Sequence, residues 1–110
     1  MVVQRYLTKP YLIDGFKFDL RLYVLVNGIS PLRVYLYNDG LARFATVPYE
    51  IPNPKNMTNL FMHLTNYAIN KDSENFVQYD DESKGSKRSY TSVLKLMRDA
   101  HGNAAVDLMQ

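Results

Sequence analysis

The chain has 110 residues, a formal net charge of +2 at pH 7 and no cysteine. This length fits one domain with its own core, and it is small for a complete enzyme with two substrates. The slight charge argues against a nucleic-acid surface, no apolar run reaches the length of a membrane span, and the lack of cysteine excludes a disulfide framework and a thiolate metal site.

The N-terminal segment predicts a short strand followed by a turn. Residues 1–7 are mainly apolar, and Pro10 ends this strand because proline cannot donate to a ladder. Asp14-Gly15 is a turn dipeptide. It opens a long predicted strand, residues 16–26, around which the remaining chain is organised.

Charged and apolar side chains alternate in the first half of this strand. Lys17, Asp19 and Arg21 share one parity, so they would line one face about 7 Å apart in steps of two. Residues 22–26 are apolar at every position, which is typical of a strand covered on both sides. The three charges could bind one polyanionic ligand at the rim of a core, while a surface ion-pair ladder is the commoner source of such alternation.

Two hairpin signals follow the long strand. Residues 27–31 are dense in turn formers, and residues 32–37 predict the next strand. Asn38-Asp39-Gly40 contains Asp-Gly, the strongest short-range hairpin signal, and residues 41–47 predict its partner strand. Residues 16–47 therefore predict an antiparallel meander of three strands.

The C-terminal half predicts loops and one helix. Residues 48–59 hold three prolines and predict an irregular loop, and the polar residues 71–90 predict a mobile loop with solvated charges. Residues 91–100 predict a helix that Ser89 can cap and Gly102 can end. The expected fold class is therefore α+β, an antiparallel β-meander with a long loop and a C-terminal helix.

Polar side chains gather in the apolar segment between the two loops. His63, Thr65 and Asn66 can coordinate phosphate oxygens or a carboxylate without adding a competing negative charge. A buried histidine or asparagine beside a loop often satisfies only nearby backbone groups, and Arg43 alone could be a half-exposed strand arginine. His63 and His101 lack the spacing of a zinc site, and the scattered glycines form no phosphate loop.

Five ordered segments together resemble the tubulin tyrosine ligase-like family, and its polyglutamylase branch is the nearest match. The segments are VQRYL at 3–7, KP at 9–10, DGFKFDLR at 14–21, YNDGLARF at 37–44 and HLTNYAINK at 63–71. The resemblance is nearly continuous over residues 2–79 and weakens through the helix. Their common order and spacing make the match specific, although each segment alone would be weak.

The resemblance implies an ATP-grasp fold, in which ATP lies between two β-rich lobes. Members ligate an amino acid to a protein, most often glutamate onto glutamate side chains of tubulin, through an acyl phosphate and with ATP and Mg²⁺. It implies tubulin or microtubule tails and glutamate as partners, with no nucleic acid and no membrane. The implied location is the cytoplasm and cytoskeleton, on microtubules, in a cilium or at a basal body.

The resemblance also implies roles for individual residues. Lys17 would offset phosphate charge, Asp19 would contact the nucleotide or help to organise magnesium, and Arg21 and Arg43 would be catalytic arginines that reach the substrate carboxylate or acyl phosphate. The hinge segment, whose backbone faces the adenine, matches Gln4, Arg5, Tyr6 and Leu7. The substrate-binding segment that lines the same pocket matches His63, Thr65 and Asn66. The alternating charges of the strand are therefore better interpreted as part of an active site.

Family members run to several hundred residues, so we expect residues 1–110 to be a central fragment of the ATP-grasp domain that acts only within a longer chain. The N-terminal lobe and the later magnesium-binding segment have no counterpart in these residues, and Asp19 alone cannot supply a metal site. The alternative is a truncated, inactive module that binds tubulin or another acidic partner through Arg21, Arg43 and residues 84–88. A small nucleic-acid binder is a third hypothesis. The amino acid ligated, the acceptor and the choice between initiation and elongation stay open.

The isolated fragment is also expected to associate through uncovered strand edges and an exposed apolar face.

Overall fold

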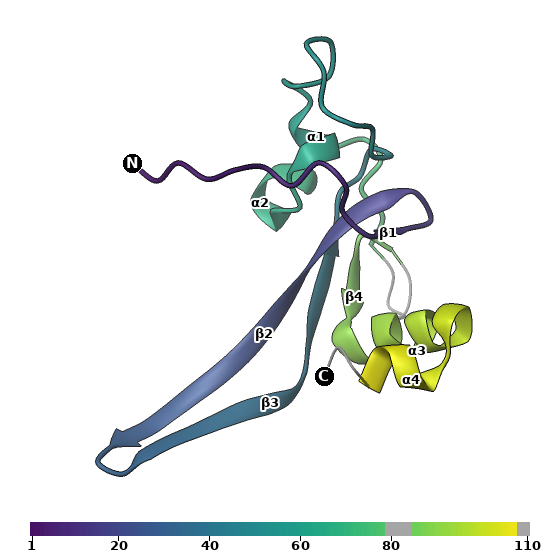
Figure 1. Ribbon diagram of the computed structural model, residues 1–110. Helices are drawn as coiled ribbons and strands as arrows, with labels where there is room; N and C mark the ends of the chain where they lie inside the picture. The colour runs from purple at the N-terminus through teal and green to yellow at the C-terminus, as the bar shows by residue number, and fades with distance from the viewer. Residues whose placement is uncertain (79–84, 108–110) are drawn as a thin grey trace. The chain divides into compact units, whose positions relative to one another are not determined.

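Figure 1 shows the computed structural model of the chain, which describes residues 1–78 and 85–107. The described part holds an antiparallel sheet in the order β1-β2-β3-β4 and four helices. The α+β class is confirmed, in a form consistent with part of an ATP-grasp-like domain. The strands are β1 (Leu12–Ile13), β2 (Phe16–Ile29), β3 (Leu32–Phe44) and β4 (Lys87–Ser89), and the helices are α1 (Leu60–His63), α2 (Tyr67–Asn70), α3 (Tyr90–His101) and α4 (Asn103–Asp107).

The chain divides into two compact units. Unit 1 comprises Met1–Phe18 and Phe44–Phe76, and unit 2 comprises Asp19–Arg43 and Val77–Gln110. The long strands β2 and β3 each contribute residues to both units.

The turn between β1 and β2 in unit 1 forms where Asp14-Gly15 predicts it. Ile13 pairs with Phe16, so Asp14 and Gly15 between them form a two-residue hairpin loop. Asp14 has φ 54° and Gly15 has φ 83°, the positive values that a tight hairpin of this kind requires at both central positions. This turn fixes the register that places Lys17 opposite Leu12.

The core of unit 1 forms around the beginning of β2 and the end of β3. Phe18 and Phe44 stack with ring centroids 5.3 Å apart, and Phe44 is only 3% exposed. The backbone N–H of Ala45 donates to the Lys17 carbonyl over 2.8 Å. The N–H of Thr46 donates to the Phe61 carbonyl over 3.1 Å and thereby ties α1 to the chain that follows β3.

The strand predicted for residues 1–7 is not present, and this prediction was wrong. These residues are irregular and exposed, with Val2 and Val3 each at 83% exposure. A strand exists only where a neighbouring strand accepts and donates its backbone hydrogen bonds. In the described ranges no strand pairs with this segment, so its apolar composition alone does not make it extended sheet.

The turn predicted within residues 27–31 is present, whereas the hairpin predicted at Asn38-Asp39-Gly40 is absent, and that prediction was wrong. β2 and β3 are joined at residues 30–31, and β3 runs unbroken through Asn38, Asp39 and Gly40 instead of turning there. A Cβ at Gly40 would lie 2.5 Å from the backbone oxygen of Arg21 in unit 2. The glycine therefore serves a close approach of two backbones and not a turn.

The apolar residues 22–26 were predicted to be covered on both sides, and this too was wrong. In β2, Leu22 is 43% exposed and Leu25 is 62% exposed, and their neighbours in β3 are equally open to solvent. Figure 1 shows β2 and β3 here as a two-stranded ribbon. Among the described residues nothing packs closely enough to bury either face of this ribbon, hereafter the exposed ribbon, residues 22–37.

The predicted helix is confirmed as α3 in unit 2. The Ser89 hydroxyl accepts a hydrogen bond from the N–H of Ser92 over 3.2 Å, and Gly102 ends the helix with φ 85°. Val93, Leu94, Met97 and Val106 of α3 and α4 form the buried apolar core together with Ala42 of β3. The longest helix in the described ranges has 12 residues, and none there is of a length and apolarity that would let it cross a bilayer.

The predicted loop of residues 71–90 contains regular structure at its end. β4 pairs with β3 in the register Leu41 with Ser89, and Tyr90 begins α3. Residues 79–84 of this loop lie outside the described residues. Its mobility stays a prediction, while residues 48–59 form the irregular loop and turns that their prolines predict.

Asp39 supplies a second cap for α3 within unit 2. One carboxylate oxygen accepts from the Gly40 N–H over 2.8 Å and from the Thr91 N–H over 3.1 Å. Burial by itself raises the pKa of Asp39, but these backbone hydrogen bonds outweigh it, so the pKa lies below its ordinary value. The N–H groups of Thr91 and Ser92, which have no partner inside the helix, thus both find side-chain oxygens.

Asp39→Asn is expected to reduce the loss of unfolding free energy that the chain shows as the pH falls. Because the folded-state pKa of Asp39 is lowered, its contribution is present above the unfolded pKa of about 3.9 and is lost as the pH falls through the folded value. Urea unfolding followed by circular dichroism between pH 6 and acid pH measures this. Wild type should lose its advantage over Asp39→Asn on acidification, and an advantage independent of pH would contradict the assignment.

Candidate active site

Lys17 lies in a polar cluster of unit 1 that also contains Tyr6 and His63. Its ammonium nitrogen Nζ donates to the Tyr6 hydroxyl over 3.1 Å and to the His63 main-chain carbonyl over 2.8 Å. Nζ also lies 4.5 Å from the centre of the Tyr6 ring. In the described chain no carboxylate pairs with Lys17, so its charge is held by neutral acceptors and is available to an anion.

His63 is buried at 8% exposure and is held by groups on two sides. Its Nε2 lies 3.1 Å from the Asn56 carbonyl and 3.3 Å from the Asn56 side-chain oxygen, and its Nδ1 lies 3.3 Å from the Tyr6 hydroxyl. The ring also makes an edge contact with Tyr49 at 5.8 Å between centroids. The histidine predicted at this site is therefore both buried and fully engaged.

Tyr49 closes the other side of this cluster. Its hydroxyl donates to the Thr8 carbonyl over 2.7 Å, which fastens the N-terminal segment to unit 1. Burial, followed by a hydrogen bond with Tyr6, raises the pKa of Tyr49 above its ordinary value. Tyr49 is thus a neutral wall of the cluster.

Thr65 and Asn66 follow His63 in the chain and are placed differently. Thr65 is buried at 8% exposure, whereas Asn66 is exposed. The Asn66 carbonyl accepts from the Nδ2 of Asn70 over 3.1 Å, and the same Nδ2 donates to the Leu64 carbonyl over 2.8 Å. Asn70, which the site prediction did not include, thereby fixes the backbone on which these residues lie.

Unit 2 pairs two of the predicted site residues directly. The guanidinium of Arg43 contacts the Asp19 carboxylate through two nitrogens, with Nε to Oδ1 at 2.8 Å and Nη2 to Oδ2 as the second contact. This hydrogen bonding raises the pKa of Arg43 above its ordinary value. Both carboxylate oxygens of Asp19 are occupied, so this bidentate pair presents little net charge of its own.

Arg21, two residues further along β2, has an exposed guanidinium in unit 2. Its central carbon lies 5.9 Å from the centre of the Tyr23 ring, on the same face of the strand. No ion pair of the described residues includes Arg21. A guanidinium that lies over an aromatic ring without a carboxylate partner can bind a carboxylate or phosphate in bidentate fashion.

The remaining predicted site residues belong to the N-terminal segment. Gln4, Arg5 and Leu7 are exposed, and Tyr6 differs from them because its hydroxyl is part of the Lys17 cluster. The expected convergence of Lys17, Asp19, Arg21 and Arg43 on one hollow involves residues of both units, and it stays a prediction.

The described residues do not form a magnesium site by themselves. Magnesium requires about six oxygen ligands in nearly octahedral geometry. In residues 1–78 and 85–107 no three side chains of the His, Cys, Asp and Glu types come together as a metal site would need, and Asp19 is engaged by Arg43. Lys17, by contrast, suits a phosphate group, because it carries an unneutralised charge on a constrained stem.

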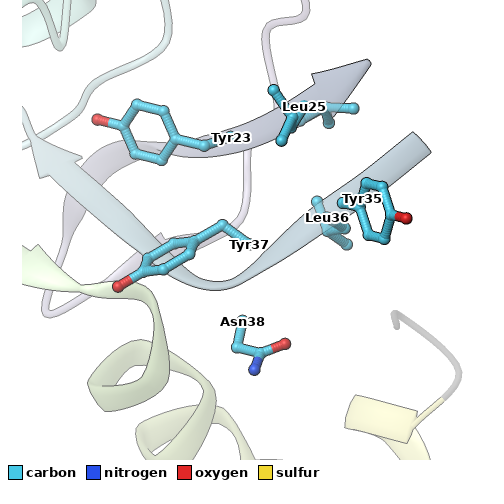
Figure 2. A pocket seen from close by; sticks show the side chains of 7 residues that line it. Tyr23, Leu25, Tyr35, Leu36, Tyr37 and Asn38 are labelled. Carbon is cyan, nitrogen blue, oxygen red and sulfur yellow. The ribbon is translucent and has the colours of Figure 1, made fainter. Parts of the chain in front are cut away.

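Figure 2 shows a hollow on the exposed ribbon of unit 2. Side chains from both long strands line it, among them Tyr23, Leu25, Leu36 and Tyr37. All seven of its lining residues are uncharged, and their polar side-chain groups are the tyrosine hydroxyls and the Asn38 carboxamide. Its walls therefore offer mainly apolar contact and no charged group that could neutralise phosphate.

Sequence comparison identifies the family. The model of the Tubulin-tyrosine ligase family matches residues 1–106, and this chain belongs to that family. The resemblance predicted from the five segments is thereby confirmed.

Curated relatives with high identity carry related names. The chain is 61% identical over 101 residues to a "Probable beta-tubulin polyglutamylase" of Tetrahymena thermophila, covering 89% of this chain and 8% of that protein. It is 54% identical over 99 residues to tubulin polyglutamylase TTLL13 of Mus musculus, covering 90% of this chain and 12% of that protein. It is 56% identical over 102 residues to tubulin polyglutamylase TTLL6 of Mus musculus, covering 93% of this chain and 12% of that protein. The chain thus spans about a tenth of the length of these relatives.

Proposed function

We propose that this chain forms part of the active site of an ATP-dependent ligase that adds glutamate to glutamate side chains of tubulin. The observation that carries the proposal is the family match over residues 1–106 together with relatives that are named tubulin polyglutamylases at 54–61% identity. The proposed location is the cytoplasmic cytoskeleton, on microtubules and in a cilium or at a basal body. Because the chain spans about a tenth of these relatives, the activity is assigned to the longer protein.

The proposed reaction joins a carboxylate to an amine at the expense of ATP. The acceptor carboxylate oxygen attacks the γ-phosphorus, the bond to the ADP oxygen breaks, and an acyl phosphate results. The amine of the incoming glutamate then attacks the acyl carbon, so a C–N bond forms, phosphate leaves and the amine loses its extra protons to solvent. The protein contributes mainly by positioning the reactants and by neutralising charge.

The residues of this chain fit two parts of that chemistry. Lys17 is proposed to neutralise phosphate charge, since it carries an ammonium without a carboxylate partner. Arg21 is proposed to bind the carboxylate or acyl phosphate through its exposed guanidinium. Asp19 and Arg43 are proposed to act as a bidentate pair beside the nucleotide and substrate. The wall of the pocket is proposed to include His63, Thr65 and Asn66. The backbone of Gln4, Arg5, Tyr6 and Leu7 is proposed to face the adenine. No step is assigned to Mg²⁺ here, because the described residues do not assemble its ligands.

The proposal is tested by incubating the full-length protein with tubulin, labelled glutamate, Mg²⁺ and ATP. We expect label in tubulin that withstands denaturation and disappears when ATP is omitted, and mass spectrometry should locate it on glutamate side chains. Parallel reactions with labelled glycine and tyrosine measure the choice of amino acid. Tubulin binding that weakens with salt but gives no ATP-dependent incorporation would contradict the proposal and favour the inactive binding module.

A further inference from the structure

Within the described residues of unit 1, two acceptors hold the Lys17 ammonium. They are the Tyr6 hydroxyl at 3.1 Å and the His63 carbonyl at 2.8 Å. An ammonium group has three N–H donors. Two are therefore directed at the protein, and one is left for a ligand. A lysine held in this way loses less conformational entropy on binding an anion than one that moves freely.

The Tyr6 hydroxyl also lies against His63, whose own surroundings fix which of its ring nitrogens can accept. Nε2 of His63 faces two oxygens of Asn56, at 3.1 Å and 3.3 Å, and both are acceptors, so Nε2 carries a proton. The Asn56 side-chain oxygen is identified as such because it also accepts from the Asn53 N–H over 2.9 Å. In the neutral ring Nδ1 is then an acceptor that the Tyr6 O–H can reach across 3.3 Å, and the Tyr49 oxygen is a second acceptor for that proton because Tyr49 donates its own to Thr8.

The Tyr6 oxygen accepts from Lys17 whichever of these two acceptors takes the Tyr6 proton, because an ammonium group can only donate. Lys17 donates to the Tyr6 oxygen, the Tyr6 hydroxyl also lies 3.3 Å from Nδ1 of His63, and Nε2 of His63 donates to Asn56. None of these groups is a carboxylate. The arrangement fixes the place of the lysine nitrogen without neutralising its charge.

We propose that the side chain of Tyr6 is a positioning residue that, together with His63 and Asn56, holds the Lys17 ammonium in place for an anionic phosphate group. The part of this inference that concerns phosphate rests on the proposed ATP-dependent function. The part that concerns Lys17 rests on the unit 1 contacts alone. The role differs from that of the hinge backbone, since it depends on the hydroxyl of Tyr6.

The first test measures Lys17 in the full-length protein without any nucleotide. Tyr6→Phe removes the hydroxyl and keeps the ring, so Lys17 loses one acceptor and should react about threefold faster with an acylating reagent. Mass spectrometry quantifies the labelling of Lys17 against Lys9 and Lys55, which are exposed in this structure and should react at unchanged rates. Tyr37→Phe is the matched control, because Tyr37 is 65% exposed and lies in the exposed ribbon. An unchanged rate at Lys17 in Tyr6→Phe would overturn the positioning role.

The second test measures the dissociation constant of ATP in a double-mutant cycle. Tyr6→Phe alone should weaken ATP binding by about threefold to tenfold, the range expected for a lost hydrogen bond to a charged group. In a Lys17→Met background the same change should have almost no further effect, because Tyr6 then has no ammonium to hold. Lys17→Gln provides the same background with a polar side chain if Lys17→Met does not fold. Additive effects of Tyr6→Phe and the Lys17 change would show that Tyr6 acts by another route.

The two tests separate the inference from the function on which part of it rests. Faster labelling of Lys17 with unchanged ATP binding in both single variants would support the positioning of Lys17 and contradict its phosphate role. Wild-type protein that binds no ATP would reject the proposed function, while the labelling result would still decide the role of Tyr6. Equal unfolding midpoints for wild type and Tyr6→Phe would exclude a general loss of structure as the cause.

Discussion

Replacing Arg21 with alanine in the full-length protein is expected to abolish the incorporation of glutamate into tubulin while leaving the fold intact. The Arg21 guanidinium is exposed, lies 5.9 Å from the Tyr23 ring and forms no ion pair with the described residues. Its removal therefore breaks no contact with a carboxylate but deletes the planar fork available to an anionic substrate. Loss of such a charge-stabilising donor lowers kcat/KM by about 10²-fold or more.

The measurement is the ATP-dependent labelling assay, with unfolding midpoints recorded for each variant. Arg33→Ala is the matched control, because Arg33 is an exposed arginine of β3 to which no role is assigned, and it should leave the rate nearly unchanged. Arg21→Lys keeps the charge and loses the fork, so it should recover only a small part of the activity. Retained activity in Arg21→Ala with normal folding would reject the role of Arg21.

Asn70→Ala is expected to cost about 3 kcal/mol of unfolding free energy, because it leaves buried polar groups without partners. Asn70 is 1% exposed, and its side-chain oxygen accepts from the Thr46 N–H over 3.1 Å and the Thr46 hydroxyl over 2.9 Å. Its Nδ2 donates to the carbonyls of Leu64 and Asn66 over 2.8 Å and 3.1 Å. All these partners belong to unit 1, so the damage should fall on the backbone that carries Thr65 and Asn66.

Urea unfolding of the chain by circular dichroism measures this cost. Asn75→Ala is the matched control, because Asn75 is exposed and its side chain makes none of the hydrogen bonds described here, so it should change stability by less than about 0.5 kcal/mol. Asn70→Asp should also destabilise the chain, since a carboxylate oxygen would face two carbonyl oxygens in place of the Nδ2 donor. Equal stability of Asn70→Ala and Asn75→Ala would show that the Asn70 hydrogen bonds contribute little.

Local sequence signals predicted those parts of the fold that local interactions determine. The cap of α3 at Ser89, the end of the helix at Gly102 and the tight turn at Asp14-Gly15 all involve partners within a few residues. Such features can be recognised without knowing what else lies nearby. The same holds for the irregular loop of residues 48–59, because prolines restrict the backbone at their own positions.

The two Asp-Gly dipeptides show the limit of predicting a turn from local sequence alone. Asp14-Gly15 adopts the positive φ angles of a turn, whereas Asp39-Gly40 lies inside a continuous strand. The difference comes from Arg21, whose backbone oxygen approaches Gly40, and from Thr91, whose N–H binds Asp39 from 52 residues away. No pattern around residue 40 carries that information, so the hairpin prediction was wrong there.

The candidate site was predicted in part for the same physical reason. The alternation predicted that Lys17, Asp19 and Arg21 share one face. It could not show that Asp19 pairs with Arg43, or that Arg21 lies over the Tyr23 ring instead. The resemblance pointed to the backbone around Tyr6, and the hydroxyl of Tyr6 escaped notice because its partners lie 11 and 57 residues away. Asn70 gave no signal beyond its place in the last matching segment.

The exposed ribbon has a practical consequence for work with this chain. Tyrosine and aliphatic side chains on two hydrogen-bonded strands meet water over many residues, and Leu25, Tyr35 and Leu36 are all more than half exposed. Such a surface lowers the concentration at which a purified polypeptide stays monodisperse, and it attracts hydrophobic dyes even when the protein is folded. Biophysical measurements on the 110-residue chain therefore need dilution series and light scattering alongside them.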